Sequence, residues 1–220
     1  LNNQNNKKNS IIAEIKRRSP SKGMLAENLN VSKTVSEYES GGAACISVLT
    51  EKDYFNGSNE DLLEAKNSIN LPLLRKDFML DPIQIYESKM LGADCVLLIV
   101  SALSQSTYKK LFELASQLDL DVLTEVHDIY ELDFALSQNS KLIGINNRNL
   151  KSFDVDINTS IDLASSINDN DIVLVSESGI SSSSDIITLN SSGIYTFLVG
   201  EHLIKSNNIT NELGVLINGE

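Results

Sequence analysis

Short apolar runs alternate with more polar segments along almost the whole chain. Eight runs have the length and character of strands: IIAEIK (11–16), AACISVLT (43–50), LPLLRKDF (71–78), ADCVLLIV (93–100), DVLTEVH (121–127), LIGINNR (142–148), DIVLVSES (171–178) and TFLVG (196–200). Nearly continuous apolar character is typical of parallel strands that are covered on both faces. The pattern therefore predicts eight buried parallel strands.

The segments between these runs have helical spacing. In DPIQIYESKMLG a proline suits the first turn and three apolar residues share one face: Pro82, Ile83, Tyr86 and Met90. SQSTYKKLFELASQL carries a longer apolar stripe, made of Tyr108, Leu111, Leu114, Ala115 and Leu118. A helix after each strand gives an eightfold β/α repeat.

The repeat favours an α/β fold of the (β/α)8 TIM-barrel class over an open doubly wound sheet, which stays as the alternative. No GxGxxG follows the first run, so the fingerprint that would favour the open sheet is absent. A chain of 220 residues with 41% hydrophobic content is long enough for one large core. We predict a flexible lead-in over residues 1–10 and a single barrel domain over residues 11–220.

Charge and composition exclude some classes of binding partner and indicate the state of the cysteines. The formal net charge of −12 disfavours a nucleic-acid partner, because binding to phosphodiesters requires clustered Lys and Arg. The sequence contains neither a long apolar span nor a charged-then-apolar leader, so we expect a cytoplasmic protein without membrane contact. Cys45 and Cys95 lie inside apolar runs, without CxxC spacing, and we expect both to be reduced core residues.

Polar residues enter the predicted strands mainly near their C-terminal ends. Because side chains alternate between the two faces of a strand, one face carries, late in the first, third, fifth, sixth and seventh runs, Glu14, Lys16, Lys76, Glu125, Asn146 and Glu177. Each alone could equally face a helix or solvent. In a barrel, however, the C-terminal strand ends form the one mouth where active sites lie, so we expect these side chains to converge there with Arg148 at the rim. Arg75 and Asp77 alternate away from the mouth, which favours ion pairing in the outer layer.

A second group of residues suggests an anion site. SESGIS (176–181) leaves the seventh run through Ser178 and Gly179, and Gly200 and Glu201 end the eighth. Loops after strands seven and eight, with free backbone N–H groups, are the usual phosphate site of this architecture. Either segment alone is better explained as an ordinary glycine turn plus a serine-rich loop. Together they favour a phosphate site.

These stretches resemble, in order and spacing, the motifs of indole-3-glycerol phosphate synthase. The resemblance is carried over residues 11 to about 205 by IIAEIKRRSPSKG, ISVLTEKDYFNGS, LPLLRKDF, GADCVLLIV, LTEVHD, GINNRNL, VSESGI and FLVGE. It implies a carboxy-lyase of tryptophan biosynthesis that needs no metal or organic cofactor. It also implies closure of the ring of 1-(2-carboxyphenylamino)-1-deoxyribulose 5-phosphate, with loss of CO2 and water. The family has an extra N-terminal helical segment, which we expect to be largely absent here. We expect a monomer or an association with other tryptophan-pathway enzymes.

The resemblance also implies roles for the mouth residues. Lys76 would be the general acid, positioned by Glu14, and Glu125 would assist proton removal during dehydration. Glu177 would stabilise the cationic intermediate, while Lys16 and Asn146 would hold the carboxylate and sugar oxygens. The phosphate would lie against Ser19, Ser178, Gly179, Gly200 and Glu201. The aromatic ring would lie between Phe55, Phe78, Leu97 and Leu150.

The remaining points are the expected pKa of Lys76 and the alternative functions. A lysine near other cations has a pKa lowered towards neutrality, where general acid catalysis is efficient, and we expect this of Lys76. Other readings are a different phosphosugar barrel, such as phosphoribosylanthranilate isomerase, or a barrel that binds phosphosugars or proteins without turnover. The isomerase uses a Cys and an Asp as its acid and base, and the position of Cys45 in the middle of its run argues against it.

Overall fold

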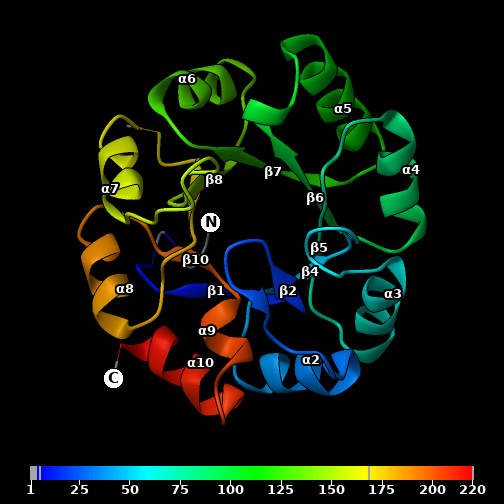
Figure 1. The fold of residues 1–220 in the computed structure, drawn as a ribbon. Helices are drawn as coiled ribbons and strands as arrows, with labels where there is room; N and C mark the ends of the chain where they lie inside the picture. Colours follow the sequence, from blue (N-terminus) through cyan, green and yellow to red (C-terminus); the bar gives the residue numbers. More distant parts are fainter. Residues whose placement is uncertain (1–3, 5, 168, 220) are drawn as a thin grey trace.

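The computed structural model describes residues 4, 6–167 and 169–219, in which eight parallel strands close into a barrel (Figure 1). The order around the barrel is β1-β10-β9-β8-β7-β6-β5-β4, and β4 pairs with β1 to close it. The strands are β1 (Ser10–Ile15), β4 (Cys45–Leu49), β5 (Leu73–Lys76), β6 (Cys95–Ile99), β7 (Asp121–Val126), β8 (Leu142–Asn146), β9 (Val173–Glu177) and β10 (Thr196–Val199). Each of the eight predicted runs overlaps one of them, and the predicted (β/α)8 barrel is confirmed.

Helices form a ring outside the strands (Figure 1). They are α2 (Val31–Ser40), α3 (Asn59–Ser68), α4 (Pro82–Met90), the 3-10 turn η1 (Val100–Ala102), α5 (Gln105–Gln117), α6 (Ile129–Ser137), α7 (Asn158–Ala164), α8 (Ser183–Asn190), α9 (Glu201–Ile204) and α10 (Ile209–Asn218). Side chains of Asn30, Ser58, Asp81, Ser104, Asp128 and Ser182 cap the N-termini of several helices. These short polar residues accept the backbone N–H groups that a helix start leaves free, so they fix where each helix begins.

The apolar core has two layers. Between strands and helices lies the larger one, which receives the outward-pointing residues Ile11, Ala13 and Ile15 of β1. Inside the barrel lies a smaller cluster, made of Ile12, Leu74, Cys95, Leu97, Ile99, Leu123, Val175 and Leu198. Apolar side chains thus fill the interior of the barrel below the C-terminal ends of the strands, as strand alternation predicts.

Helix α4 turns the opposite face to the core from the one that its apolar residues suggest. Ile83 and Met90 are 66% and 87% exposed, and Tyr86 is also exposed, whereas Ile85 and Ser88 are completely buried. The buried face carries Ile85, which joins the larger apolar core, and Ser88, whose hydroxyl accepts from the guanidinium of the buried Arg75 on β5 at 3.2 Å. An apolar stripe therefore identified the helix correctly but not the face that packs.

Arg75 forms the outer-layer ion pairs that its strand position predicts. Its Nη2 lies 3.4 Å from Asp77 Oδ2 and 2.7 Å from Glu87 Oε2, and its Nε donates to Thr50 Oγ1 at 3.0 Å. Thr50 in turn donates to Asp77 at 2.6 Å. These contacts tie the C-terminal ends of β4 and β5 together and so fix the position of Lys76 between Arg75 and Asp77.

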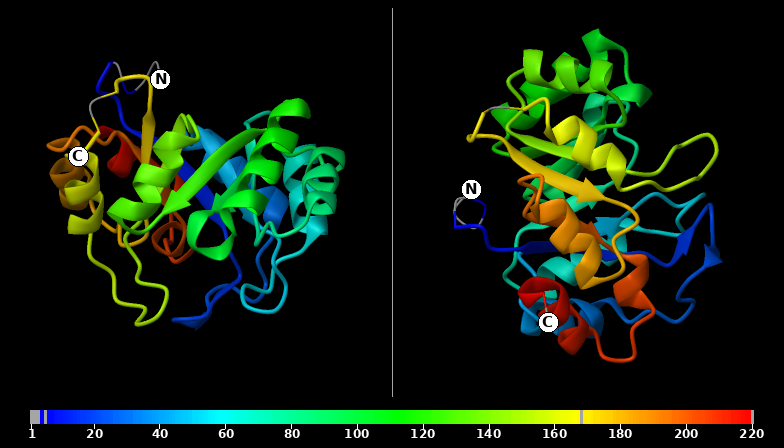
Figure 2. Two further views of the ribbon diagram at one scale, coloured as in Figure 1. Left: turned by 90° about the horizontal axis from the view of Figure 1, so that it is seen from above. Right: turned by 90° about the vertical axis from the view of Figure 1, so that its left-hand side faces the viewer.

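Three long loops extend from one end of the barrel, and β1 enters from the opposite end (Figure 2). They are residues 16–30, which contain the hairpin of β2 (Arg18–Ser19) and β3 (Gly23–Met24), residues 50–58 and residues 147–157. All three follow the C-terminal ends of parallel strands.

Cys45 is the first residue of β4 rather than a residue in the middle of that strand, so it lies near the opposite end of the barrel from these loops. Both cysteines are free, and burial raises the pKa of Cys45 to about 12 and that of Cys95 as well.

The first strand begins at Ser10, one residue before the predicted domain boundary. Residues 1–3 and 5 of the predicted lead-in lie outside the described residues. Within the lead-in, Gln4 Nε2 donates to Ile172 O at 2.8 Å and Asn9 Nδ2 to Ile217 O at 3.1 Å. Across the described residues, the helices are all too short or too polar to cross a membrane.

Candidate active site

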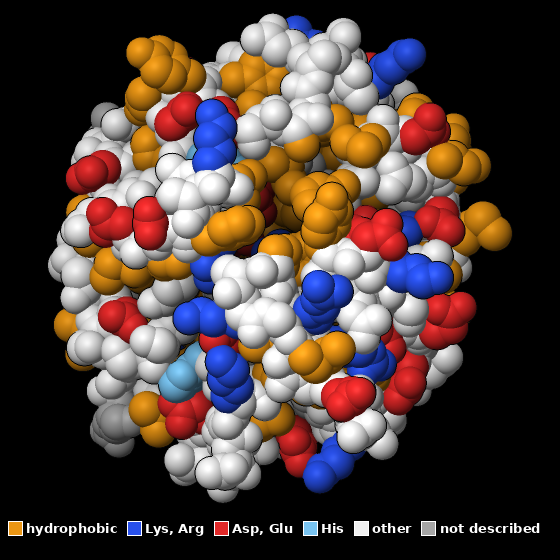
Figure 3. Space-filling model, in the orientation of Figure 1, with side chains coloured by type: hydrophobic (Ala, Val, Ile, Leu, Met, Phe, Trp, Pro, Cys, Tyr) orange, Lys and Arg blue, Asp and Glu red, His pale blue; other side chains and the backbone are white. Residues whose placement is uncertain are grey.

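A cavity of about 410 Å³ opens at the C-terminal ends of the strands. Figure 3 shows a hollow at the centre of this face, with apolar side chains around it and Lys and Arg side chains along one side. All the predicted site residues except Glu177 line the cavity, namely Glu14, Lys16, Ser19, Phe55, Lys76, Phe78, Leu97, Glu125, Asn146, Arg148, Leu150, Ser178, Gly179, Gly200 and Glu201. Glu177 lies beneath it and reaches it through Lys76.

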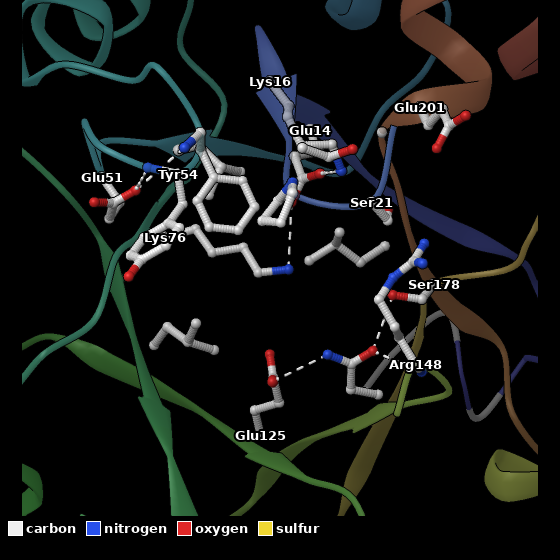
Figure 4. Close-up of a pocket in the computed structure, with 18 of the residues that line it drawn as sticks. Glu14, Lys16, Ser21, Glu51, Tyr54, Lys76, Glu125, Arg148, Ser178 and Glu201 are labelled. Carbon is white, nitrogen blue, oxygen red and sulfur yellow. Dashed lines mark hydrogen bonds and ion pairs between the residues drawn. The ribbon is translucent and has the colours of Figure 1, made fainter. Parts of the chain in front are cut away.

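Lys76 is the centre of the ionic cluster. Its Nζ lies 3.3 Å from Glu14 Oε1 (Figure 4) and 2.8 Å from Glu177 Oε2, so β5 is linked to β1 and β9 across the barrel. Lys16 pairs with the other oxygen of Glu14 at 2.5 Å. The two carboxylates are almost completely buried, and a buried charge is tolerated only when it is paired. Glu14 thus holds both lysines in place.

The environment of Lys76 is anionic, contrary to the expectation from sequence. Burial would lower its pKa, but Glu177, Glu14 and Glu125 together raise it above its ordinary value. The predicted shift towards neutrality is therefore wrong, because the neighbours of Lys76 are carboxylates rather than cations. The amine is held as an ammonium ion at neutral pH.

The two carboxylates paired with Lys76 have opposite pKa shifts. Burial would raise the pKa of Glu14, but Lys16 and Lys76 lower it to about 2. For Glu177, burial is the largest effect, and the neighbouring Glu125 and Glu14 add to it, so that Lys76 does not prevent a rise to about 7. Glu14 is therefore ionised at all ordinary pH values, while Glu177 can take up a proton near neutrality.

Two glycines make room for these carboxylates. A Cβ at Gly144 on β8 would collide with Glu177 Oε1, and one at Gly200 after β10 would collide with Glu14 Oε2. Gly200 is one of the residues that the family resemblance places at the phosphate, whereas Gly144 is not among the predicted site residues. Both positions face the barrel interior, where any larger residue would displace a carboxylate from Lys76.

Glu125, on β7, approaches the cavity from the side opposite Glu14 (Figure 4). Asn146 Nδ2 donates to Glu125 Oε1 at 3.1 Å. The amide oxygen of Asn146 accepts from Ser178 Oγ at 2.9 Å and from the backbone N–H of Arg148 at 3.0 Å. This chain of hydrogen bonds fixes the Asn146 amide orientation and links β7, β8 and the loop after β9.

The turn after β9 presents its backbone to the cavity. Ser178 and Gly179 both have positive φ, of 66° and 82°, and a Cβ at Gly179 would collide with Val155. Behind them, Asp185 accepts the backbone N–H groups of Ser181 and Ser182, each at 3.0 Å, so these two groups before α8 are already paired. The Ser178–Gly179 turn and Gly200–Glu201 line the cavity, and their backbone would offer N–H groups to an anion there.

Ser19 and Glu201 both line the cavity. Ser19 is buried in the β2–β3 hairpin, where its hydroxyl accepts from the backbone N–H of Lys22 at 3.2 Å. Glu201 pairs with Lys205 at 2.6 Å. Burial would raise the pKa of Glu201, but Lys205 lowers it. Its carboxylate is thus engaged by Lys205, one helical turn further along the chain.

Aromatic side chains form one wall. The ring centroids of Phe55 and Phe78 are 6.5 Å apart, and Tyr54 lies edge-on to Phe78 at 6.4 Å. Glu51 shapes this loop by accepting the backbone N–H groups of Tyr54 and Phe55, at 2.7 and 3.2 Å. The buried Leu97 and the half-exposed Leu150 line the same cavity. The arrangement suits a flat aromatic ring.

Several site residues escaped the sequence analysis. Tyr54, Glu51, Ser21, Phe153 and His202 line the cavity from loops and short turns, which have no periodicity to place them. His127 contacts Glu125, and alternation along β7 could have found it, because Leu123, Glu125 and His127 lie two residues apart. Among the described residues, no group of three or more His, Cys, Asp or Glu side chains could hold a metal ion.

Comparison with known proteins extends this picture. The family model for indole-3-glycerol phosphate synthase matches residues 1–216 of the chain. The match covers the whole barrel and every residue that lines the cavity.

Similar solved structures have the same fold at low sequence identity. Thiamine phosphate pyrophosphorylase from Pyrococcus furiosus superposes with a TM-score of 0.69 and 15% identity, covering 97% of this chain and 96% of that chain. KGPDC from Streptococcus mutans superposes with a TM-score of 0.70 and 12% identity, covering 96% of this chain and 97% of that chain. N-acetylmannosamine-6-phosphate 2-epimerase from Clostridium perfringens superposes with a TM-score of 0.67 and 14% identity, covering 89% of this chain and 87% of that chain. These likenesses establish the barrel alone.

Proposed function

Because the chain belongs to the indole-3-glycerol phosphate synthase family, whose members are carboxy-lyases, we propose that it converts 1-(2-carboxyphenylamino)-1-deoxyribulose 5-phosphate to indole-3-glycerol phosphate. The observation that carries the proposal is the amine of Lys76, which lies between Glu14 and Glu177 in the wall of a cavity that Glu125 also lines. One ammonium group among three carboxylates matches a reaction that needs proton donation, proton removal and stabilised positive charge.

Lys76 acts in the first step. The ring carbon that bears the carboxylate attacks the ribulose carbonyl carbon, and the electron pair of the C=O bond moves to oxygen. Lys76 donates a proton to that oxygen, which becomes a hydroxyl group. Its raised pKa keeps the donor charged, so that it also stabilises the negative charge developing on oxygen. Glu14 acts as its positioning residue.

The carboxylates act in the later steps. Loss of CO2 returns its bonding electrons to the ring. Lys76, recharged with a proton from solvent, then protonates the hydroxyl, which leaves as water while the nitrogen lone pair forms a cationic iminium. Glu177 and Glu125 stabilise this positive charge electrostatically. Glu125 takes the proton from the former sugar carbon next to nitrogen, and the released electron pair completes the indole ring.

The remaining residues bind the substrate. Lys16, Asn146 and Arg148 suit the anthranilate carboxylate and the sugar hydroxyls. Backbone N–H groups at Gly179, Gly200 and Glu201, together with the hydroxyls of Ser19 and Ser178, suit the phosphate. Two of the similar barrels carry a phosphorylated compound in their names, thiamine phosphate and N-acetylmannosamine 6-phosphate, which supports a phosphorylated ligand for this barrel type. The aromatic wall suits the ring of the substrate.

The direct test is turnover by the purified chain. With 1-(2-carboxyphenylamino)-1-deoxyribulose 5-phosphate, we expect indole fluorescence and CO2 to appear in equal amounts. Conversion of phosphoribosylanthranilate instead would indicate the isomerase alternative. Saturable binding of the ribulose phosphate without either product would indicate a binding protein and refute the enzyme.

A further inference from the structure

His127 lies directly behind the proposed base. It follows β7 two residues after Glu125, and its Nε2 lies 3.2 Å from Glu125 Oε1. The side chain is largely buried, at 16% exposure, and it does not line the cavity. Its contact is therefore with Glu125 rather than with a substrate.

Glu131, in the first turn of α6, holds His127 in one orientation. Its Oε2 accepts the backbone N–H of His127 at 2.9 Å and lies 3.0 Å from the ring Nδ1. The backbone N–H of Glu131 itself donates to Asp128 Oδ1 at 2.9 Å, which caps the helix. A helix start therefore fixes Glu131, Glu131 fixes the imidazole, and the imidazole presents Nε2 to Glu125.

The contact distinguishes the two oxygens of Glu125. Oε1 accepts a hydrogen bond from Asn146 Nδ2 at 3.1 Å, while His127 Nε2, a buried atom without a hydrogen-bond partner among the described residues, lies at ion-pair distance from the same oxygen. For Oε2, no hydrogen bond is found to any residue that the structure describes. The Asn146 hydrogen bond and the His127 ion pair both engage Oε1, so Oε2 is the oxygen left for a substrate in the cavity.

The surrounding charges favour a protonated imidazole. Glu131 faces His127 from α6 and Glu125 from its own strand, while Lys76 and Glu177 face Glu125 from β5 and β9. Burial would lower the pKa of His127, but Glu125 and Glu131 raise it to about 10. Burial would likewise raise the pKa of Glu125, but His127 and Lys76 lower it.

We propose that His127 is a positioning residue for Glu125: held by Glu131, it anchors Oε1 and presents Oε2 to the substrate as the single proton acceptor. The inference rests on the proposed function, because it assigns the base of that reaction its orientation. It predicts that His127 acts only through Glu125, and Glu131 only through His127.

The first experiment is independent of turnover. The chain has two histidines, so ring ¹⁵N NMR with a His202→Gln variant for assignment gives the pKa of His127 directly. We expect the ring to remain protonated above pH 8 and its pKa to fall in Glu125→Gln and Glu131→Gln. Titration near the ordinary value of about 6.5 in the wild type would overturn the proposal whether or not the protein is an enzyme.

The second experiment measures kcat and KM across pH. In His127→Gln we expect kcat to fall by roughly 10–100-fold, as when an orienting partner of a metal ligand is removed, with KM nearly unchanged. The acidic limb of the kcat profile moves to higher pH, because Glu125 loses a cation. Glu131→Gln keeps a helix-capping oxygen and should shift the same limb by less. The double variant His127→Gln with Glu131→Gln should have the same kcat as His127→Gln alone.

Each outcome decides a separate claim. A His127→Gln profile that superimposes on the wild type, or a double variant in which the two losses multiply, refutes the positioning role. A purely structural role would lower thermal stability without moving the acidic limb. Wild-type protein that turns over no substrate refutes the proposed function, and the NMR titration then still decides the contact.

Discussion

Replacing Lys76 by Met should separate the ionic and catalytic roles of this amine. The change keeps the alkyl chain but removes the cation 2.8 Å from Glu177 Oε2. Glu14 retains Lys16, whereas Glu177 loses its one ion-pair partner among the described residues, and its Oε1 already lacks a hydrogen bond. The Coulomb energy at this distance is about 6 kcal/mol with an effective dielectric constant of about 20. After the desolvation of lysine is subtracted, we expect a net loss of about 3–5 kcal/mol.

The loss should depend on pH in a defined direction. The folded-state pKa of Glu177 is raised to about 7 from an ordinary 4.5, so its destabilising effect is absent below pH 4.5 and develops as the pH rises through 7. Without Lys76 this pKa rises further. Urea denaturation of Lys76→Met should therefore give a large deficit at pH 8.5 and a much smaller one at pH 5.

A second substitution provides the control. Lys76→Met with Glu177→Gln removes both charges and should recover most of the stability at pH 8.5, while turnover stays roughly 10²–10⁴-fold below the wild type or lower, the range for loss of a general acid. If Lys76→Met were as stable as the wild type at pH 8.5, or if Glu177→Gln failed to restore it, the ionic account of this cluster would be refuted.

Three further predictions follow from the site. The pKa of Glu14 is about 2 in the folded protein against an ordinary 4.5, so Glu14 contributes roughly 3 kcal/mol to the free energy of unfolding above pH 4.5, and this contribution is lost as the pH falls towards 2. Glu14→Gln should therefore be less stable than the wild type at pH 7 by about this amount in urea denaturation. Equal stability of the two proteins would contradict the pairing of Glu14 with the lysines. Glu125→Gln should slow dehydration and let an intermediate accumulate in single-turnover traces. If the traces of this variant were the same as those of the wild type, Glu125 would not be the base. Ser178→Asp should raise KM at least tenfold by repelling phosphate, with KM for Ser184→Asp, on the exposed start of α8, as the control; an unchanged KM would locate the phosphate elsewhere.

Strand alternation accounts for most of what could be foreseen. Once the barrel was inferred, period-two spacing put Glu14, Lys76, Glu125 and Glu177 on the inner face, because a strand leaves a side chain only two directions. Their placement at one end followed from the parallel direction of the strands. Each of these four side chains takes part in the ionic contacts at the mouth.

Alternation says nothing of distances between strands, and this explains what was missed. The pKa of Lys76 depends on which charges lie within a few ångströms, and the nearest are carboxylates on β1 and β9. The buried face of α4 combines Ile85 with Ser88, and the hydrogen bond from Arg75 to Ser88 joins two elements whose contact alternation does not predict. Tyr54 lies in a loop whose path is set by Glu51, and no periodic signal marks such a loop.

The measurement that tests the central claim most directly combines binding and turnover in one pair of proteins. Calorimetry and single-turnover CO2 release are compared for the wild type and for Lys76→Met with Glu177→Gln, using 1-(2-carboxyphenylamino)-1-deoxyribulose 5-phosphate. We predict that both proteins bind the compound with similar affinity and that only the wild type releases CO2 and forms the indole ring. Equal rates of CO2 release from the two proteins would contradict the claim that the amine at the barrel mouth starts the reaction.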